Sequence, residues 1–296
     1  MIALTTPTGQ IGRQTLENLL AAGEEVRVLV RDPGRLPAET RERVAVVTGS
    51  MDDADAVVAA FAGAEAAFWV VPPNPRAESV AGHILGFAGA LCAAIERSGV
   101  ERVVAVSSLG RGVARHAGQI SAIIALDHLV ESTGVAYRAL CPPGFMENML
   151  HQAGSLAATG TFYSLPPVDL PLPTCATRDI AAVAAEVLRD RTWEGQASVP
   201  LPGPERLSGE DMAAILSAVL GRPIDVQRVA PEAYKATLVE HGMTDAWAQG
   251  LLDMASAAER GIYDGAPADP RHPTPTTFRE WSEAVLRPAV LAAAPV

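Results

Sequence analysis

The sequence predicts an α/β protein: a Rossmann-type, doubly wound parallel sheet followed by a smaller, mostly helical C-terminal substrate lobe. Short apolar segments rich in Val and Ala alternate with helical patterns through the first half of the chain. Strands that are almost continuously apolar are typical of a parallel sheet with helices on both faces. A Thr- and Gly-rich turn joins the first strand to the first helix, as in many ligand-binding α/β sheets.

The expected elements of the first half follow one another closely. The strands begin with the apolar run after Met1 and continue at 25–30, 44–47, 66–71, 102–106 and 136–140, and the helices lie at 12–22, 54–61, 80–98 and 120–132. Pro72 and Pro73 end the fourth strand, and Gly99 ends the long helix. Strands and helices alternating in this way predict crossover connections in one parallel sheet.

The pattern changes after Met149. Residues 155–178 are rich in Pro, Thr and Ser, and 200–208 is expected to be a loop. Helical patterns lie at 178–188, 209–220, 232–241 and 246–260, and a Pro-rich loop and the segment 278–286 follow. We therefore expect a first domain at 1–150 and a lobe at 151–296, with 176–190 packing back on the first domain. The lobe should cover the carboxyl ends of the strands, where open α/β sheets bind ligands.

Residues 2–12 (IALTTPTGQIG) are expected to build an anion site. The first N–H groups of a helix lack intrahelical partners, and the helix dipole favours negative charge there. Gly9 and Gly12 have the spacing of a dinucleotide fingerprint: one lets the pyrophosphate approach the backbone, and the other lets the helix pack on the strand. Thr6 stands at the first glycine position, where its Cβ restricts the turn. A tight turn without a ligand is the alternative.

The end of the second strand favours NADP(H) over NAD(H). The segment VRVLV at 26–30 leads into Arg31, Asp32 and Pro33. In a βαβ unit this position faces the adenosine ribose, where a carboxylate accepts from a free 2′-hydroxyl and an arginine binds a 2′-phosphate. Because Arg31 precedes Asp32, the phosphate is favoured. A solvated arginine at a strand end is the alternative.

Composition excludes several classes of partner. The net charge is −11 and the arginines are scattered, so we expect no nucleic-acid partner. Cys92, Cys141 and Cys175 have no CxxC spacing, which argues against a metal site and for a reducing cytoplasm. The apolar stretches are interrupted by charge or glycine, and no signal-peptide pattern precedes the first strand, so no membrane partner is expected. The expectation is a cytoplasmic protein with a small-molecule substrate, and a homodimer is left open.

Five segments carry a family resemblance: TTPTGQIGR at 5–13, VRVLVRDP at 26–33, VTGSMDD at 47–53, VVAVSSLG at 103–110 and STGVAYRALCPPGFMEN at 132–148. As a set they resemble the atypical short-chain dehydrogenase/reductase group, specifically its NmrA-like and triphenylmethane-reductase-like NAD(P)-binding members. The resemblance covers most of 1–220, and the tail at 208–296 looks like the C-terminal lobe of these proteins.

The resemblance implies a set of cofactor-binding positions. The turn that starts at Thr6 would cradle the phosphates through Thr8, Gly9, Gln10, Ile11 and Gly12. Arg31 would contact the adenosine phosphate, while Met51 and Asp52 would lie beside adenine. Val71, Pro72 and Ser107 would line the nicotinamide approach, and Pro143, Gly144 and Phe145 would bound its far side. Each position also has an ordinary structural alternative, such as a strand end, a turn or, for Asp52, a helix cap.

One departure from the family pattern concerns catalysis. Typical members use Tyr-x-x-x-Lys, in which the lysine lowers the tyrosine pKa so that the phenol exchanges a proton with substrate. Aligned on Asp127, the lysine position holds Ile123 and the tyrosine position holds Gln119. The nearby His116 and His128 are expected to be surface or core residues. Ser108 is the candidate catalytic residue, because a hydroxyl after the fifth strand would lie close to the nicotinamide.

Two functions fit these observations. The first is an NADPH-dependent reductase that transfers hydride to a small conjugated acceptor (quinoid, azo, dye-like or enone), in which delocalisation carries the developing charge and water supplies the proton. A flat acceptor would suit an apolar platform in the second lobe, built from Phe145, Met146, Met149, Phe162, Tyr163 and Trp247. The alternative is that these side chains form the core of that lobe. The second is a non-catalytic, NADP(H)-binding, redox-sensing regulator of the NmrA type that acts through a protein partner.

Overall fold

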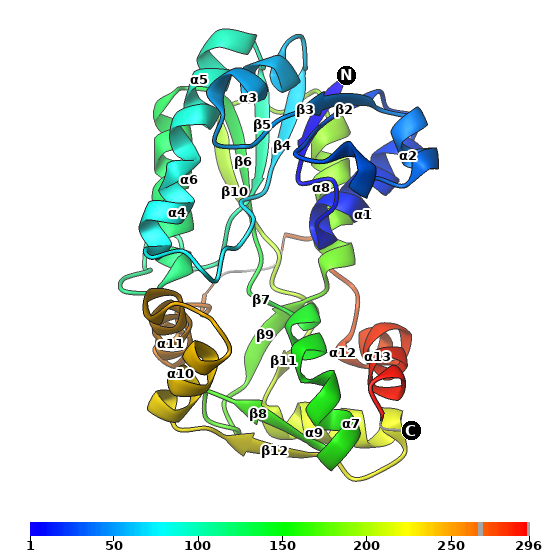
Figure 1. The fold of residues 1–296 in the computed structure, drawn as a ribbon, viewed down its shortest axis with the longest axis vertical. Helices are drawn as coiled ribbons and strands as arrows, with labels where there is room; N and C mark the ends of the chain where they lie inside the picture. Colours follow the sequence, from blue (N-terminus) through cyan, green and yellow to red (C-terminus); the bar gives the residue numbers. More distant parts are fainter. Residues whose placement is uncertain (266–268, 295–296) are drawn as a thin grey trace.

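The computed structural model describes residues 1–265 and 269–294. Within them, the central sheet has seven strands in the order β10-β6-β5-β4-β1-β2-β3, and all neighbours run parallel (Figure 1). The strands are β1 (Ile2–Thr5), β2 (Val26–Val30), β3 (Ala45–Thr48), β4 (Ala66–Trp69), β5 (Arg102–Val106), β6 (Ala136–Cys141) and β10 (Gln196–Pro200). The chain proceeds from β1 outward in both directions, so the order reverses between β1 and β4. This confirms the predicted doubly wound sheet.

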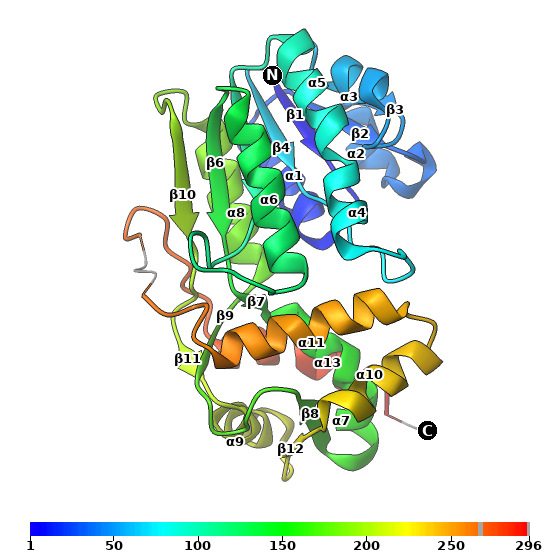
Figure 2. The ribbon, with the colours of Figure 1, turned by 90° about the vertical axis from the view of Figure 1, so that its left-hand side faces the viewer.

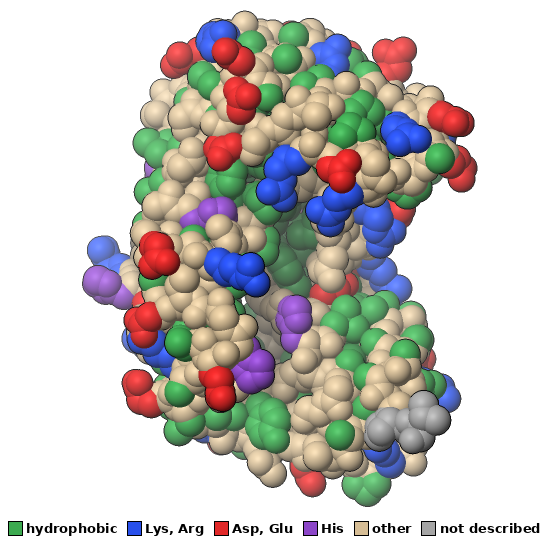
Figure 3. Space-filling view, viewed as in Figure 1, with side chains coloured by type: hydrophobic (Ala, Val, Ile, Leu, Met, Phe, Trp, Pro, Cys, Tyr) green, Lys and Arg blue, Asp and Glu red, His purple; other side chains and the backbone are tan. Residues whose placement is uncertain are grey.

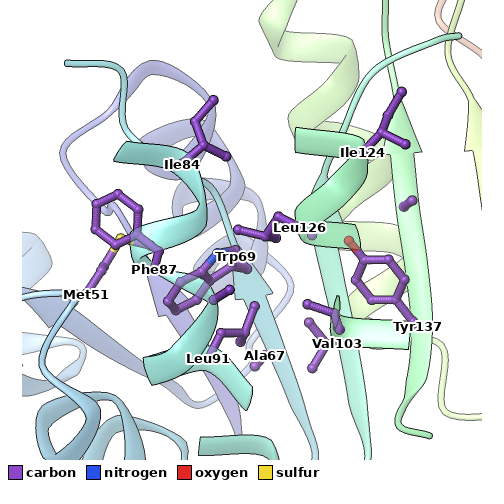
Figure 4. Packing of buried hydrophobic residues seen from close by; sticks show 14 of the residues in the cluster. Met51, Ala67, Trp69, Ile84, Phe87, Leu91, Val103, Ile124, Leu126 and Tyr137 are labelled. Atoms are coloured by element: carbon purple, nitrogen blue, oxygen red, sulfur yellow. The ribbon is translucent and has the colours of Figure 1, made fainter. Parts of the chain in front are cut away.

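Helices cover both faces of the sheet (Figures 1 and 2). One face carries α3 (Ala54–Phe61), α4 (Val80–Gly86), α5 (Ala88–Ser98) and α6 (Gln119–Ser132); the other carries α1 (Gln10–Ala21) and α8 (Thr177–Arg189), and α2 (Ala38–Glu42) lies between β2 and β3. Figure 4 shows the core under the first face, where Trp69, Leu91 and Tyr137 are almost completely buried. On the second face, Leu16 and Leu19 of α1 share a core with Ile180 of α8. Residues 176–190 therefore contain a helix that packs against α1.

The predicted helix at 80–98 is interrupted at Phe87. By length and composition alone, Val80–Ser98 is one stretch apolar enough to cross a membrane, with 19 residues and a mean hydropathy of 1.3. The prediction that the apolar stretches are too interrupted for this is therefore wrong for Val80–Ser98. Ile84, Leu91 and Ala94 on its inner side are buried in the core beside the sheet, and this packing accounts for apolar residues on that side.

The second lobe lies beyond the carboxyl edge of the sheet (Figure 2). Its strands are β7 (Gly144–Phe145), β8 (Thr161–Ser164), β9 (Leu172–Cys175), β11 (Arg206–Leu207) and β12 (Asp225–Arg228), in two small sheets. Its helices are α7 (Ala153–Thr159), α9 (Gly209–Leu220), α10 (Pro231–Glu240), α11 (Asp245–Glu259), α12 (Phe278–Trp281) and α13 (Arg287–Ala292), with a 3-10 segment at Met146–Gln152 and a π segment at Ser282–Leu286. The Pro-, Thr- and Ser-rich stretch 155–178 contains β8, β9 and the end of α7, and the loop predicted at 200–208 is wrong in part, since it contains β11.

Hydrogen bonds around Glu147 join the lobe to the sheet helices. The Glu147 carboxylate accepts from the backbone N–H of Thr177 at 3.0 Å and from its hydroxyl at 2.7 Å, at the start of α8. It also accepts from the indole N–H of Trp281 at 3.1 Å. Gln14 of α1 donates to the Thr177 hydroxyl at 2.9 Å. One carboxylate thus connects both helices of this face to the second lobe.

Candidate functional site

The turn after β1 presents free backbone donors. The Gly9 N–H donates to the Thr6 carbonyl at 3.0 Å, and α1 begins at the next residue, Gln10. Gly9 is the N-cap and offers no side chain, and the first turn of α1 contains no acidic residue. The first N–H groups of this helix are therefore left for a ligand, and the helix dipole favours an anion there.

Gly9 and Gly12 have different roles in this turn. A Cβ at Gly12 would lie 2.8 Å from the Thr6 carbonyl carbon and closer still to its oxygen, so only glycine lets α1 pack on the turn. A Cβ at Gly9 would lie 3.5 Å from the Thr6 oxygen, an ordinary contact. Gly9 is also exposed, so its missing side chain leaves the backbone open to approach.

Thr6 adopts the conformation that a glycine would have. Its φ is +52°, in the left-handed region that costs a side-chain-bearing residue about 1–2 kcal/mol. Its hydroxyl oxygen is buried without a hydrogen-bond partner among the described residues. The neighbouring Thr5 hydroxyl donates to the Phe68 carbonyl at 3.0 Å and accepts from the Val70 N–H at 3.3 Å, which ties β1 to the end of β4. The turn therefore keeps its shape despite the substituted first position.

The adenosine end of the expected site contains an unengaged arginine. Arg31 is exposed at the end of β2 and forms no ion pair within the described residues. Asp32 accepts from the Gly34 N–H at 2.9 Å and so caps the next turn. Asp53 caps α3 with its side chain, so the exposed Asp52 is not the helix cap that was its structural alternative. Met51 is only 7% exposed and belongs to the core shown in Figure 4.

The remaining predicted positions follow the carboxyl ends of β4, β5 and β6. Val71 and Pro72 are half-buried, Ser107 and Ser108 are buried, Pro143 is buried, and Gly144 and Phe145 are half-buried in β7. Since the strands are parallel, these ends lie along one edge of the sheet, next to the second lobe. Figure 3 shows a deep hollow between the two halves of the molecule, with apolar side chains in its depth and basic and histidine side chains around its rim.

A buried polar network lies behind β5. Asp127 of α6 is completely buried and accepts hydrogen bonds from the hydroxyl of Ser107, the guanidinium of Arg111 and the phenol of Tyr137, the last at 2.6 Å. Arg111 also pairs with Glu131. Burial raises the pKa of Asp127, although Ser107, Tyr137 and Arg111 oppose this. Burial, followed by the charge of Asp127, raises the pKa of Tyr137 well above its usual range.

This network fixes what Ser107 can offer a ligand. The proton of its hydroxyl is directed at Asp127, so its oxygen faces other partners as an acceptor. Arg111 and Tyr137 were missed at the sequence level. A tyrosine within an apolar strand, paired with an aspartate in an apolar helix, is the signal that could have found them, because buried polar groups need partners.

Gln119 and Ile123, at the Tyr-x-x-x-Lys positions, are half-buried and carry no acid–base group. Both polar atoms of the Gln119 amide are buried, and no described residue bonds to them. The side chain lies against α11, since a Cβ at Gly250 would be 3.0 Å from the Gln119 oxygen. His116 is exposed, and His128 is a surface residue whose ring lies 3.1 Å from Glu131.

The expected apolar platform is only partly available. Met146 and Phe162 are 2% exposed and belong to the core of the second lobe, and Trp247 is 5% exposed, with its ring edge-on to His83. Phe145 and Met149 are half-buried, and Tyr163 is exposed. Across residues 1–265 and 269–294, no cluster of His, Cys, Asp and Glu could hold a metal ion.

Comparison with known proteins settles the family. The sequence profile of the NmrA-like family matches residues 1–281. The chain belongs to the NmrA-like family. Among its relatives, an NAD(P)H azoreductase of Xenophilus azovorans is 28% identical over 294 residues, which cover 96% of this chain and 97% of the relative. A (4-alkanoyl-5-oxo-2,5-dihydrofuran-3-yl)methyl phosphate reductase of Streptomyces griseus is 30% identical over 300 residues, covering 95% and 96%.

Solved structures of other proteins share the fold. The Citrobacter sp. triphenylmethane reductase complexed with NADP(H) superposes with a TM-score of 0.81 at 18% identity, covering 99% of this chain and 100% of the other. The NADPH-dependent quinone oxidoreductase of Escherichia coli complexed with NADPH gives 0.79 at 24% identity, covering 96% and 99%. The predicted resemblance to the NmrA-like and triphenylmethane-reductase-like proteins is confirmed.

Proposed function

We propose that this protein is an NADPH-dependent reductase that transfers hydride to a small conjugated acceptor. The observation that carries the proposal is the turn at Thr6–Gly12, which keeps the shape and the free donors of a dinucleotide site at the point where the strand order reverses. The full-length match to relatives named as an azoreductase and as a reductase supports the enzymatic class.

The described residues fit a nicotinamide coenzyme. The N–H groups of Gln10, Ile11 and Gly12 would bind the diphosphate, and Arg31 would bind the adenosine 2′-phosphate, which favours NADP(H) over NAD(H). Asp52 would lie on the adenine side, with Met51 beneath it. Val71, Pro72 and Ser107 would line one side of the nicotinamide, with Pro143, Gly144 and Phe145 on the other. When bound, the coenzyme supplies a hydride.

The chain's own residues restrict the acceptor. The Ser107 proton is held by Asp127, the Gln119 amide is enclosed, and the position of the lysine is occupied by Ile123. Ser108 stays the candidate catalytic hydroxyl. Because Gln119 and Ile123 supply no acidic proton at the Tyr-x-x-x-Lys positions, the acceptor would spread its developing charge and take its proton from water. Quinoid, azo, dye-like and enone compounds do so, and the positioning of such a molecule would provide most of the rate.

The test follows NADPH absorbance in the presence of quinones, azo dyes, triphenylmethane dyes and enones. We expect oxidation of NADPH with at least one class, and slower oxidation of NADH at equal concentration. Tight NADPH binding with no turnover across the panel would reject the reductase.

The second candidate is a non-catalytic NADP(H)-binding regulator of the NmrA type that acts through a protein partner. The enclosed Gln119 and the apolar Ile123 at the Tyr-x-x-x-Lys positions favour it. The same panel separates the two functions. The domain boundary at 150, a homodimer and a cytoplasmic location stay predictions.

A further inference from the structure

A recess of about 430 Å³, open to solvent, lies between the loop after β4 and the turn that joins α10 to α11, and we call this open recess the cavity. It is lined by Asn74, Pro75, Arg76, Leu238, His241, Gly242 and Met243. One wall comes from the sheet domain and the other from the second lobe. A recess between two parts of a fold is a usual place for a small-molecule site.

The two walls are fixed to each other. The Thr244 N–H donates to the Pro75 carbonyl at 2.9 Å, and the Thr244 hydroxyl donates to the Ala77 carbonyl at 2.7 Å. Within the loop, the Asn74 side chain accepts from the Arg76 N–H at 3.2 Å, and the Asn74 carbonyl accepts from the Ala77 N–H at 2.9 Å. The cavity is therefore built before any ligand arrives.

The charge in the cavity is positive, although the chain carries a net charge of −11. Arg76 is exposed and takes part in no ion pair with a described residue. The nearby carboxylate of Asp245 is paired with Lys235 at 2.8 Å. The Nδ1–H of His241 donates to the Thr237 carbonyl at 2.7 Å, so Nε2 of the neutral ring is an acceptor, and Arg76 is the cation that this lining offers to an anion. A guanidinium without a protein partner in a recess suits an anionic group.

The remaining lining indicates what the anion is attached to. Pro75, Leu238 and Met243 supply apolar surface beside Arg76. Pro72, which we place at the nicotinamide approach, lies four residues before Arg76, and its carbonyl is held by His83 at 2.8 Å. Four residues of chain span at most about 14 Å. Since about 14 Å is the largest possible separation, Pro72 and Arg76 lie within reach of one aromatic molecule of two or three rings with an acidic substituent.

We propose that this cavity binds the anionic group, a sulfonate, carboxylate or phosphate, of an acceptor whose conjugated part reaches the edge formed by the ends of β4 and β5. The inference rests on the proposed reductase function and assigns its substrate class: acceptors that carry an acidic substituent. Arg76 is the residue that selects them.

The test compares 1-phenylazo-2-naphthol with its 4′-sulfonate, using NADPH and the full-length protein. We expect Arg76→Gln to lower the ratio of kcat/KM for the sulfonated dye to that for the neutral dye about 10-fold or more, mainly through KM, because hydrogen bonds to charged groups contribute about 1.5–3 kcal/mol. The matched control is Arg287→Gln, an exposed arginine at the start of α13, which should leave the ratio within about 2-fold of the wild type. An unchanged ratio in Arg76→Gln, or an equal change in both variants, would overturn the inference.

A binding measurement keeps the inference separate from the reductase. Naphthalene-2-sulfonate is titrated calorimetrically into the NADP⁺-loaded protein, with inorganic sulfate as the second arm. We expect the aromatic sulfonate to bind wild type and Arg287→Gln but not Arg76→Gln. Failure of every dye to oxidise NADPH would reject the proposed function, while this titration would still decide the anion site. Equal binding of the free sulfate, or retained binding in Arg76→Gln, would contradict a pocket for a substrate's acidic group.

Discussion

The hydroxyl of Ser107 donates to the buried carboxylate of Asp127, which α6 holds directly behind the end of β5. Since Arg111 and Tyr137 donate to the same carboxylate, the Ser107 proton is committed to the protein interior. The oxygen of Ser107 is thereby an acceptor at the nicotinamide side of the proposed site. The hydrogen bond thus makes the properties of Ser107 at the proposed nicotinamide site depend on the buried carboxylate of Asp127.

Substitution of Asp127 and substitution of Ser107 should affect stability and NADPH binding differently. Asp127→Asn leaves the Arg111 guanidinium facing an amide, so we expect the free energy of unfolding to fall by about 3 kcal/mol. Ser107→Ala removes one hydrogen bond and should cost about 1 kcal/mol while weakening NADPH binding. Urea denaturation measures the free energy of unfolding of each variant, and NADPH titration measures its coenzyme affinity. Ser217→Ala is the control, since the Ser217 hydroxyl also forms hydrogen bonds but lies in α9 of the second lobe. Equal weakening of NADPH binding in Ser107→Ala and Ser217→Ala would contradict a special role for Ser107.

The two glycines of the β1–α1 turn should respond differently to alanine. At Gly12 a Cβ meets the Thr6 carbonyl, so Gly12→Ala should lower the melting temperature and abolish coenzyme binding. Gly9→Ala should fold with nearly normal stability, because its Cβ has room, yet bind NADPH more weakly since the side chain intrudes where the diphosphate approaches. Thermal denaturation with and without NADPH separates the outcomes. Wild-type affinity in Gly9→Ala would argue against a diphosphate at this turn.

Much of the first domain is predictable because local signals agree there with the tertiary structure. The helix predicted at 54–61 and the strand predicted at 102–106 have these bounds in the structure. Asp53 caps the helix with its side chain, and the strand is buried along nearly its whole length. In both cases the local sequence marks the element directly, through a capping side chain or through a continuous apolar run.

The missed elements lack such signals. Strand β10 lies at the edge of the sheet and pairs with β6 alone. Because the side chains of Gln196, Ala197 and Ser198 are exposed there, the strand has no apolar pattern in the sequence. The break at Phe87 directly follows Gly86, the last residue of α4, but a single glycine within an apolar helical pattern does not by itself predict a break. The acceptor role of Ser107 depends on Asp127 of α6, which also accepts from Arg111 of the β5–α6 loop and from Tyr137 of β6. Such features arise from packing, which the sequence alone does not display.

Thr6→Gly tests whether the turn is strained. Glycine adopts a φ of +52° without the side-chain penalty and removes a buried hydroxyl that has no partner among the described residues. The free energy gained by these two changes exceeds the entropic cost of the more flexible glycine in the unfolded chain. We therefore expect the free energy of unfolding to rise by about 1 kcal/mol and NADPH binding to persist. Guanidinium denaturation measures the change. A clear loss of stability would mean that the Thr6 side chain supports the turn.

Arg31→Ala should change coenzyme preference. Arg31 is exposed and unpaired within the described residues, so its loss should leave the fold intact. We expect NADPH to bind about 10-fold or more weakly and NADH to be nearly unaffected, because only the former carries the 2′-phosphate. Parallel titrations with the two coenzymes decide this. Equal weakening of both would reject the assigned role of Arg31.

Glu65 gives the stability a pH dependence. Hydrogen bonds from Arg191 and then from the Met1 ammonium lower the Glu65 pKa from the ordinary 4.5 to about 2. A carboxylate with a depressed pKa stabilises the fold above its unfolded-state pKa and loses this effect as the pH falls through the folded-state value. Glu65→Gln should therefore be less stable by about 0.5 kcal/mol at neutral pH, since the pair is largely exposed, with the difference vanishing between pH 4.5 and 2. A difference that is constant with pH, in denaturation curves of both proteins, would contradict this.

The central claim is that the turn from Thr6 to Gly12 binds the diphosphate of a nicotinamide coenzyme although its first glycine is replaced. Isothermal titration calorimetry of the wild-type protein with NADPH, and separately with NADH, tests it most directly. We predict a saturable, one-site heat with NADPH and a weaker one with NADH. No heat with either coenzyme at millimolar concentration, from protein shown to be folded, would contradict the claim.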